Sequence, residues 1–263
     1  MSTGIAEVDT RAGRAAAHPE ISAAEWAVRE ELAACYRLIS DFGWDDLTAN
    51  HMTARVPGEP GAFLINPYGL LFEEVTASNL VKIGPEGEIL SPTEHRINRT
   101  GFVIHSAVHQ ARHDAECVIH LHTKDGVAVS MTEGGILPFN QTAMAIYQDI
   151  AYHEYEGVAL NLEERERIAA DLGDRNMMLL YNHGTLTLGR SVGEAFIRNY
   201  LLEWACQTQV RALSTGRPLH DADPAVVAGV SAGMDAAAMA SYASLAWAGL
   251  LRRVRRTHPD FAD

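Results

Sequence analysis

The sequence predicts an α/β fold, and three of its features support this prediction. The chain has 263 residues and 47% hydrophobic content, which is enough to bury a large core. Capped segments with helical spacing of apolar residues alternate with short apolar runs that are typical of strands. No internal repeat or low-complexity linker divides the sequence. We therefore expect one domain over residues 21–256, preceded by a loose tail at residues 1–20.

The first part of the chain should contain one long helix and several short strands. Ser22 and Glu25 have the spacing of a capping box, so a helix should begin there and continue to about Phe42. Gly43 then provides a residue at which a helix readily ends. The strands expected in this part lie at residues 50–56, 63–66 and 81–83, the last paired with residues 88–90 across a turn.

The rest of the chain should alternate helices with buried strands. Ser191 and Glu194 form a second capping box, which predicts a long helix to about Leu213. The apolar face of this helix should carry Phe196 and Trp204. The other expected elements are a helix at 97–111, a strand at 117–121, a helix capped by Asn161 that stops at Gly173, strand-like runs at 177–181 and 185–188, and an alanine-rich helix at 236–251.

A pair of histidines at the end of the strand 117–121 is the most informative motif. His120 and His122 are separated only by Leu121, and side chains alternate between the two faces of a strand. The two imidazoles should therefore project from one face while Leu121 enters the core. A third histidine, His183, lies between two strand-like runs beside Gly184, which permits a tight turn or a close backbone approach.

These three histidines admit two interpretations. Three imidazoles brought together at strand ends leave open positions for a substrate, which is what a catalytic metal site requires. The alternative is a set of hydrogen-bonded histidines that holds no metal. Local chemistry alone leaves both interpretations open.

Four motifs occur in order along the chain: Leu47–Arg55, Phe63–Phe72, Arg112–His122 and Asn182–Phe196. Together they resemble the class II aldolase/adducin superfamily, specifically its bacterial adducin-like branch. The similarity covers roughly residues 22–255, which is nearly the whole chain. It implies a three-layer α/β/α fold of the class II aldolase type, with a central mixed or antiparallel sheet.

The resemblance also implies a metal centre and an assembly. It places His120, His122 and His183 on the family's three metal-ligand histidines. One divalent transition metal per chain is expected, with zinc first and Fe²⁺ or Mn²⁺ as alternatives. Family members are commonly cyclic tetramers, so we expect a homotetramer that acts on a small molecule. The cluster Tyr152–Tyr155 and the C-terminal helix offer apolar surface to bury between chains.

The sequence departs from the family's aldolases at three places. The glutamate that serves those enzymes as ligand and general base corresponds here to Gly101. Arg99 and Thr100 stand where the aldolases bind substrate phosphate, and the guanidinium of Arg99 suits bidentate contact with a substrate carboxylate. The stretch Phe139–Thr142 lacks the aldolases' proton-donating tyrosine. We therefore expect no sugar-phosphate aldolase activity.

Two residues are candidates for the missing acid–base role. Glu94 precedes Gly101 by seven residues and is a candidate replacement base. His105 follows Gly101 by four residues and shares a helix face with His109, so it can approach the vacated position.

Two loops are candidates for substrate binding by the resemblance. Asn50 and His51 occupy the loop that lines the substrate end of the site in family members. Asn66, Tyr68 and Gly69 lie in the loop that contacts anions in the aldolases. Both loops also have a purely structural interpretation, in which Asn50 is a turn residue and the second loop is a proline–glycine turn.

Three classes of function follow from these observations. The first is a metal-dependent lyase that cleaves a C–C bond, by retro-aldol reaction or decarboxylation, in a small hydroxy or oxo compound bearing a carboxylate. The second is a non-haem Fe(II) oxygenase that uses the same three histidines. The third is a non-catalytic scaffold like the adducin head, although polar rings kept together in a core argue against it.

Composition excludes other classes. The net charge of −13 argues against nucleic-acid binding, which requires clustered lysine and arginine. The three cysteines, Cys35, Cys117 and Cys206, have no paired spacing and predict a reduced, cytoplasmic protein. Residues 1–20 contain no apolar segment typical of a targeting signal, and no apolar stretch is long enough to span a bilayer.

Overall fold

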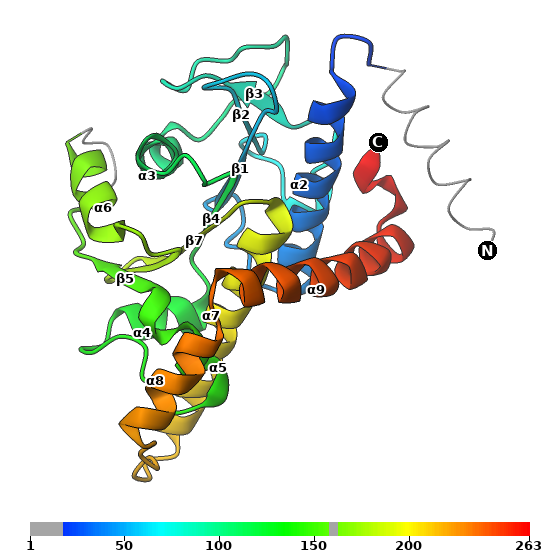
Figure 1. Cartoon of the computed structure of the whole chain (residues 1–263). Helices are drawn as coiled ribbons and strands as arrows, with labels where there is room; N and C mark the ends of the chain where they lie inside the picture. The colour runs from blue at the N-terminus through cyan, green and yellow to red at the C-terminus, as the bar shows by residue number, and fades with distance from the viewer. Residues whose placement is uncertain (1–17, 158–162) are drawn as a thin grey trace.

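The computed structural model describes residues 18–157 and 163–263, and in it helices cover both faces of a central sheet (Figure 1). The sheet has seven strands in the order β3-β2-β1-β4-β7-β6-β5. Neighbouring strands are antiparallel, except β5 and β6, which are parallel. The expected α/β fold with a mixed central sheet is therefore confirmed. The strands are β1 (His51–Arg55), β2 (Phe63–Ile65), β3 (Val81–Ile83), β4 (Cys117–Leu121), β5 (Ile150–His153), β6 (Met177–Leu180) and β7 (Gly184–Gly189).

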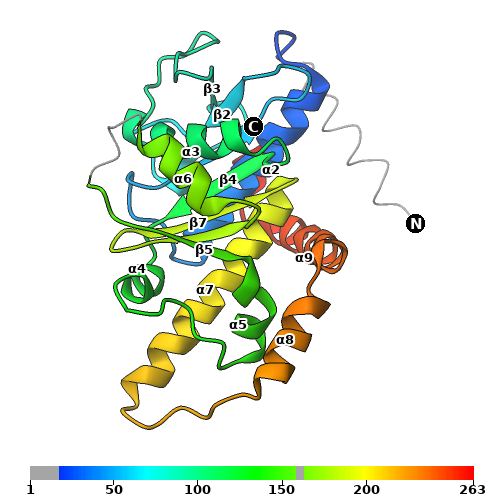
Figure 2. The same cartoon turned by 60° about the vertical axis from the view of Figure 1, so that its left-hand side comes forward.

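Two groups of helices lie on opposite sides of this sheet (Figure 2). On one side are α3 (Arg99–Ala111) and α6 (Glu164–Leu172), and we call this side the α3 face. On the other side are α2 (Ala23–Asp41) and α7 (Val192–Ser214), with α9 (Ala236–Thr257) packed across both. The remaining elements are α4 (Lys124–Ser130), α5 (Gln141–Ile146), α8 (Pro224–Gly233) and 3-10 turns at Phe72–Glu74, Tyr147–Asp149 and Pro259–Ala262.

Alternation along the strands separates the apolar cores on the two faces of the sheet and fixes the register of β4. Ile119 and Leu121 enter the core beneath α2 and α7, whereas Val118 enters the core beneath α3 and α6. His120, two residues after Val118, therefore faces α3, as does His51 on the neighbouring strand β1. Each fully buried aliphatic side chain stabilises the fold by about 1.5–3 kcal/mol relative to an exposed one. A one-residue slip of β4 would exchange those apolar groups with the histidine, so the core holds the histidine on its face.

Both expected capping residues begin their helices. The Ser22 hydroxyl accepts a hydrogen bond from the Glu25 backbone N–H at 3.1 Å, and α2 follows. The Ser191 hydroxyl likewise accepts from the Glu194 N–H at 3.1 Å at the start of α7. Each bond satisfies one of the N–H groups that a first helical turn leaves without a partner.

Several expectations need correction or fall outside the described residues. Residues 88–90 pair with β3 across the expected turn, through the bridge between Ile83 and Ile89 and a hydrogen bond from the Leu90 N–H to the Lys82 carbonyl oxygen at 2.9 Å, but this pairing is too short for them to form a strand. Trp204 is not on the apolar face of α7, because its side chain is 48% exposed and stacks on the neighbouring Tyr200. Asn161, the expected cap of α6, and residues 1–17 of the expected tail lie outside the described residues.

No single helix in the described part of the chain is long and apolar enough to cross a membrane. The pair α8 and α9, bent by 64° at the break between them, passes the same length and composition test only when taken together.

Candidate metal centre

Three histidine side chains converge at one end of the sheet. His120 and His122 come from the end of β4, and His183 comes from the turn between β6 and β7. The Nε2 atom of His122 lies 3.0 Å from Nε2 of His120 and 3.1 Å from Nε2 of His183. One ligand atom from each histidine lies within 4.8 Å of the others. The structure thus brings together the three residues that the family resemblance placed at a metal centre.

Hydrogen bonds at Nδ1 aim two of these rings. His120 Nδ1 lies 2.9 Å from the Thr185 carbonyl oxygen, so Nδ1 carries the proton and donates, and Nε2 is left with a lone pair. His122 Nδ1 lies 3.2 Å from the carboxylate of Asp46, which orients the second ring in the same way. Such outer partners fix the tautomer and direction of ligand histidines in metal sites.

The backbone around His183 explains the residues on either side of it. Asn182 has φ of 56°, in the left-handed region that asparagine tolerates, and its N–H donates to the Ser130 carbonyl oxygen at 3.1 Å. A Cβ at Gly184 would overlap the Leu121 carbonyl oxygen, so only glycine allows this close backbone approach. The turn is therefore shaped by its neighbours to deliver His183 beside β4.

The three nitrogens fit a divalent cation. The pKa of His120 lies well below its usual range, mainly because the ring is buried and secondly because His183 is its neighbour. Burial, followed by the neighbouring His122, lowers the pKa of His183 to about 4. Neutral rings with facing lone pairs repel one another unless a cation lies between them. In a tetrahedral zinc site with bonds of about 2.0–2.1 Å, ligand nitrogens are roughly 3.3–3.4 Å apart, close to the observed separations.

The histidines form one wall of a cavity of about 300 Å³, a volume suited to a small molecule. Among the described residues that line it, no side chain is acidic, lysine or arginine, so the polar groups they contribute are imidazoles, hydroxyls and an amide. The lining residues are Thr48, Ala49, His51, Tyr68, Asn98, Gly101, Ile104, His120, His122, Tyr155, Gly157 and His183.

Of the five residues that the two loops were expected to contribute to substrate binding, some line the cavity and others do not. His51 and Tyr68 line the cavity, and Gly69, with φ of 103°, follows Tyr68 in a turn. Asn50 is buried, and its side-chain oxygen accepts a hydrogen bond from the Asp46 N–H at 2.8 Å. Asn66 is also buried and hydrogen bonds to the hydroxyl of Tyr36. Asn50 and Asn66 therefore shape the loops rather than line the cavity.

The two acid–base candidates, Glu94 and His105, do not line the cavity. Glu94 is exposed in the segment before α3 and is not among the lining residues. His105 is fully buried behind His51, with its Nε2 atom 2.8 Å from Nδ1 of His51. Arg99 is the first residue of α3, between the lining residues Asn98 and Gly101, and its side chain lies outside the described part of the structure.

Two residues at the site were missed at the level of sequence. Asp46 supports His122 from a loop whose neighbour Leu47 has φ of 48°, and no spacing rule connects positions 46 and 122. Tyr155 was expected to pack aromatic surface between chains. It lines the cavity of its own chain instead, with its ring centroid 6.0 Å from that of His183. An aromatic beside a strand end was the only signal for it.

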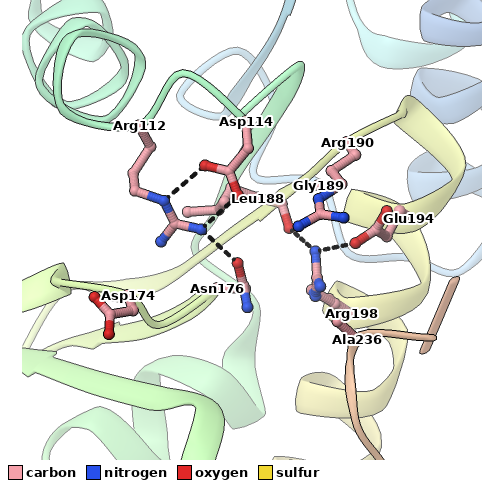
Figure 3. Close-up of a pocket in the computed structure, with 10 residues that line it drawn as sticks. All are labelled: Arg112, Asp114, Asp174, Asn176, Leu188, Gly189, Arg190, Glu194, Arg198 and Ala236. Atoms are coloured by element: carbon pink, nitrogen blue, oxygen red, sulfur yellow. Dashed lines mark hydrogen bonds and ion pairs between the residues drawn. The ribbon is translucent and has the colours of Figure 1, made fainter. Parts of the chain in front are cut away.

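A second cavity, of about 390 Å³, contains none of the three histidines (Figure 3). Its charged side chains largely bind one another. Arg112 forms an ion pair with Asp114 at 2.8 Å, and Arg198 forms one with Glu194 at 2.7 Å. This cavity lies at the other end of the β4–β7 pair, where Gly189 pairs with Cys117. The convergent imidazoles, not the larger volume, identify the candidate site.

A mixed sheet between helical layers, with a three-histidine group at its strand ends, is the architecture of the class II aldolase fold. Residues 30–210 match the family model described as the Class II Aldolase and Adducin N-terminal domain, and the chain belongs to this family.

Relatives and solved structures agree with this assignment. A Caulobacter vibrioides protein named "Putative aldolase class 2 protein" is 48% identical over 244 residues, 93% of this chain and 95% of the relative. Mouse alpha-adducin is 46% identical over 198 residues, 74% of this chain but 27% of the adducin. An aldolase II superfamily protein from Pseudomonas syringae has TM-score 0.87 and 46% identity, with 94% of this chain and 99% of that chain covered. An L-fuculose 1-phosphate aldolase from Glaciozyma antarctica has TM-score 0.80 and 26% identity, with 91% and 93% covered.

Proposed function

We propose that this protein is a metal-dependent lyase that cleaves a C–C bond, by retro-aldol reaction or decarboxylation, in a small hydroxy or oxo compound bearing a carboxylate. The observation that carries the proposal is the convergence of the Nε2 atoms of His120, His122 and His183 on the wall of a small cavity. Similarity to a fuculose phosphate aldolase supports the reaction class.

The metal is one divalent transition ion per chain, with zinc as the first choice and Fe²⁺ or Mn²⁺ as alternatives. When bound, such an ion would polarise a substrate oxygen and stabilise the negative charge that develops as the C–C bond breaks. Three neutral imidazoles leave the ion's charge undiminished, and Asp46 holds His122 in the orientation for binding.

The charge of the cavity supports a substrate that bears a carboxylate. The described part of its lining contains no acidic side chain, so a bound divalent ion would make the cavity positive. The cavity also lies beside the N-terminus of the 13-residue helix α3, where backbone N–H groups favour an anion. The hydroxyls of Tyr68 and Tyr155, both about half exposed, are available to orient the substrate.

A non-haem Fe(II) oxygenase is the second candidate. The ligand set contains no carboxylate among the described residues. Three neutral histidines would bind Fe(II) and leave open positions on the ion for substrate and oxygen. A non-catalytic role like that of a scaffold is the third, and the similarity to mouse alpha-adducin is the observation that favours it.

The experiment is a paired screen of metals and substrates. Protein purified under argon is loaded with Zn²⁺, Mn²⁺ or Fe²⁺ and offered small hydroxy and oxo acids in one set and sugar phosphates in the other. Aldehyde and carbon dioxide release are measured without oxygen, and Fe²⁺ samples are repeated in air. We expect oxygen-independent cleavage in the first set only.

Matched variants connect that activity to the three histidines. His122→Ala should lose both the metal and the turnover, whereas His113→Ala, at an exposed histidine on the loop before β4, should keep both. Turnover that requires Fe²⁺ and oxygen would replace the lyase with the oxygenase. Equal metal content in the wild type and His122→Ala would refute the site itself.

A further inference from the structure

Helix α3 and strand β1 interlock beside the cavity through polar side chains. Gly101, His105 and His109 recur every four residues along one face of α3. His51 and Thr53 occupy alternate positions of β1, so they point to the same face of the sheet. A side chain at Gly101 would overlap the ring of His51. The glycine therefore gives His51 its place on the cavity wall.

A continuous chain of hydrogen bonds runs inward from His51. Its Nδ1 lies 2.8 Å from His105 Nε2, and His105 Nδ1 lies 2.6 Å from the Thr53 hydroxyl oxygen. The same hydroxyl lies 2.8 Å from His109 Nε2. His109 Nδ1 lies 3.0 Å from the Ala115 backbone carbonyl oxygen, where the chain ends. All four side chains are at least 97% buried.

The last acceptor sets the direction of every bond. A carbonyl oxygen can only accept, so His109 Nδ1 carries a proton and its Nε2 accepts from the Thr53 hydroxyl. That hydroxyl has one proton, so its oxygen must accept from His105 Nδ1–H. His105 Nε2 then accepts from His51 Nδ1–H. The outcome is one tautomer for each ring, with an unprotonated Nε2 on His51.

The surroundings of this hydrogen-bond chain keep its imidazole rings neutral. Burial, followed by the charge of Arg55, lowers the pKa of His109 to about 3. The pKa of His105 also lies well below its usual range, mainly because the ring is buried and secondly because His109 is its neighbour. Neither ring offers a second proton that would reverse the bonds.

We propose that His51 is the catalytic residue that exchanges a proton with the substrate, and that His105, Thr53 and His109 are positioning residues that present its Nε2 lone pair to the cavity. This inference rests on the proposed lyase function. It assigns the acid–base role to His51, where Glu94 or His105 was expected.

The proton balance of a retro-aldol step is complete with this one ring. The O–H bond of the substrate hydroxyl breaks and its proton binds His51 Nε2. The oxygen's electron pair forms the new C=O bond, and the electrons of the broken C–C bond stay on the departing carbon. The His51 imidazolium then returns the proton to that carbon. The hydrogen-bond chain ends at the Ala115 carbonyl oxygen, which cannot pass a proton on. The chain therefore does not carry the proton away from His51 and only positions its ring.

The tautomers are measurable without substrate or metal. Magic-angle-spinning NMR of ¹⁵N-histidine-labelled protein, assigned with single His→Gln variants, distinguishes the two protonated nitrogens. We expect His51, His105 and His109 all to carry the proton on Nδ1. A wild-type spectrum with the proton of His51 on Nε2 would overturn this inference and leave the proposed lyase untouched.

Activity and metal content test the catalytic assignment. His51→Gln should lower kcat about 10²–10⁴-fold, the range of general acid–base catalysis, with metal content unchanged. Loss of the metal would instead make His51 a ligand, and a change below about threefold would remove it from catalysis. If the wild-type protein binds no metal or shows no turnover, the lyase proposal itself is refuted, whatever the tautomer spectra show.

Thr53 tests the positioning role, with a matched control. Thr53→Val should lower kcat with little change in KM and mix the tautomers of His105 and His51, whereas Thr53→Ser should restore both readouts. Thr187 is also a buried threonine, and its hydroxyl donates a hydrogen bond to the Ala195 carbonyl oxygen. It takes no part in the hydrogen-bond chain that runs inward from His51. Thr187→Val should leave tautomers and kcat unchanged. Unmixed tautomers in folded Thr53→Val protein, or failure of Thr53→Ser to restore them, would overturn the positioning role.

Discussion

The ring of His51 occupies the space that any side chain at position 101 would need. A Cβ on Gly101 would overlap Nε2, Cδ2 and Cε1 of that ring. The resemblance to the aldolases places a carboxylate at position 101, and in this chain an imidazole from the facing strand fills the same volume. The glycine on α3 and the imidazole on β1 therefore depend on each other for space in this chain.

This relationship predicts that the effect of a side chain at position 101 depends on His51. In the wild type, Gly101→Ala should destabilise the fold by about 1–3 kcal/mol, because it overpacks the ring. In a His51→Ala background the same change should be neutral or stabilise by up to about 1 kcal/mol, since alanine favours the helix. Urea unfolding of the four proteins gives the coupling. The same cost in both backgrounds would contradict the shared space.

Asp46 provides a second prediction, on metal affinity. Its carboxylate is the hydrogen-bond acceptor of His122 Nδ1 at 3.2 Å, so Asp46→Asn should weaken metal binding by roughly 10–100-fold. Asp45→Asn removes the same charge one residue away, where no contact with the histidines exists among the described residues, and should leave affinity nearly unchanged. Competition titration with a chromogenic chelator measures both. Equal weakening in the two variants would reduce the effect to net charge.

The sequence was sufficient to predict the fold class and the His120–His122 pair, because both depend on local patterns. Alternation on β4 fixes the direction of His120 and His122, and capping serines mark the starts of α2 and α7. Family resemblance connected His183 to them. The local pairing of residues 88–90 with β3 across a turn was also predicted, although it amounts to one bridge and not to a strand.

The immediate surroundings of the histidines could not be predicted, since they depend on contacts across the fold. His105 was noted as four residues after Gly101, but its position behind His51 requires the packing of α3 on β1. Asp46 reaches His122 across 76 residues of sequence. No periodicity reports a contact between a loop and a strand end of this kind.

The buried histidines predict a loss of stability in acid, and His109 allows a measurement of its own share. Its pKa falls from an ordinary 6.5 to about 3 in the fold, mainly through burial. The unfolded chain therefore binds the proton first, so the stability is intact above pH 6.5 and declines as the pH falls towards 3. For this single group the loss at pH 5 is about 2 kcal/mol.

A comparison of wild type and His109→Gln isolates that share. The glutamine amide can donate to Ala115 and accept from Thr53, so the fold should persist without the titrating ring. Urea unfolding of metal-free protein at pH 7.5 and pH 5.0 should show a smaller acid loss in the variant by about 2 kcal/mol. The exposed control His113→Gln should match the wild type. Equal acid losses in all three proteins would show that His109 titrates normally.

An apolar surface on α8 and α9 predicts assembly into a homotetramer. Val226 is 53% exposed, Tyr242 43% and Leu245 74%, and contact with other copies would bury them. Light scattering at micromolar concentration should give the mass of four chains of 28.7 kDa each. Leu245→Glu should shift the mass downwards, because it places a charge in the apolar contact, whereas Ala170→Glu at an exposed position on α6 should not. A wild-type mass near 28.7 kDa would refute the assembly, and an unchanged mass for Leu245→Glu would move the contact elsewhere.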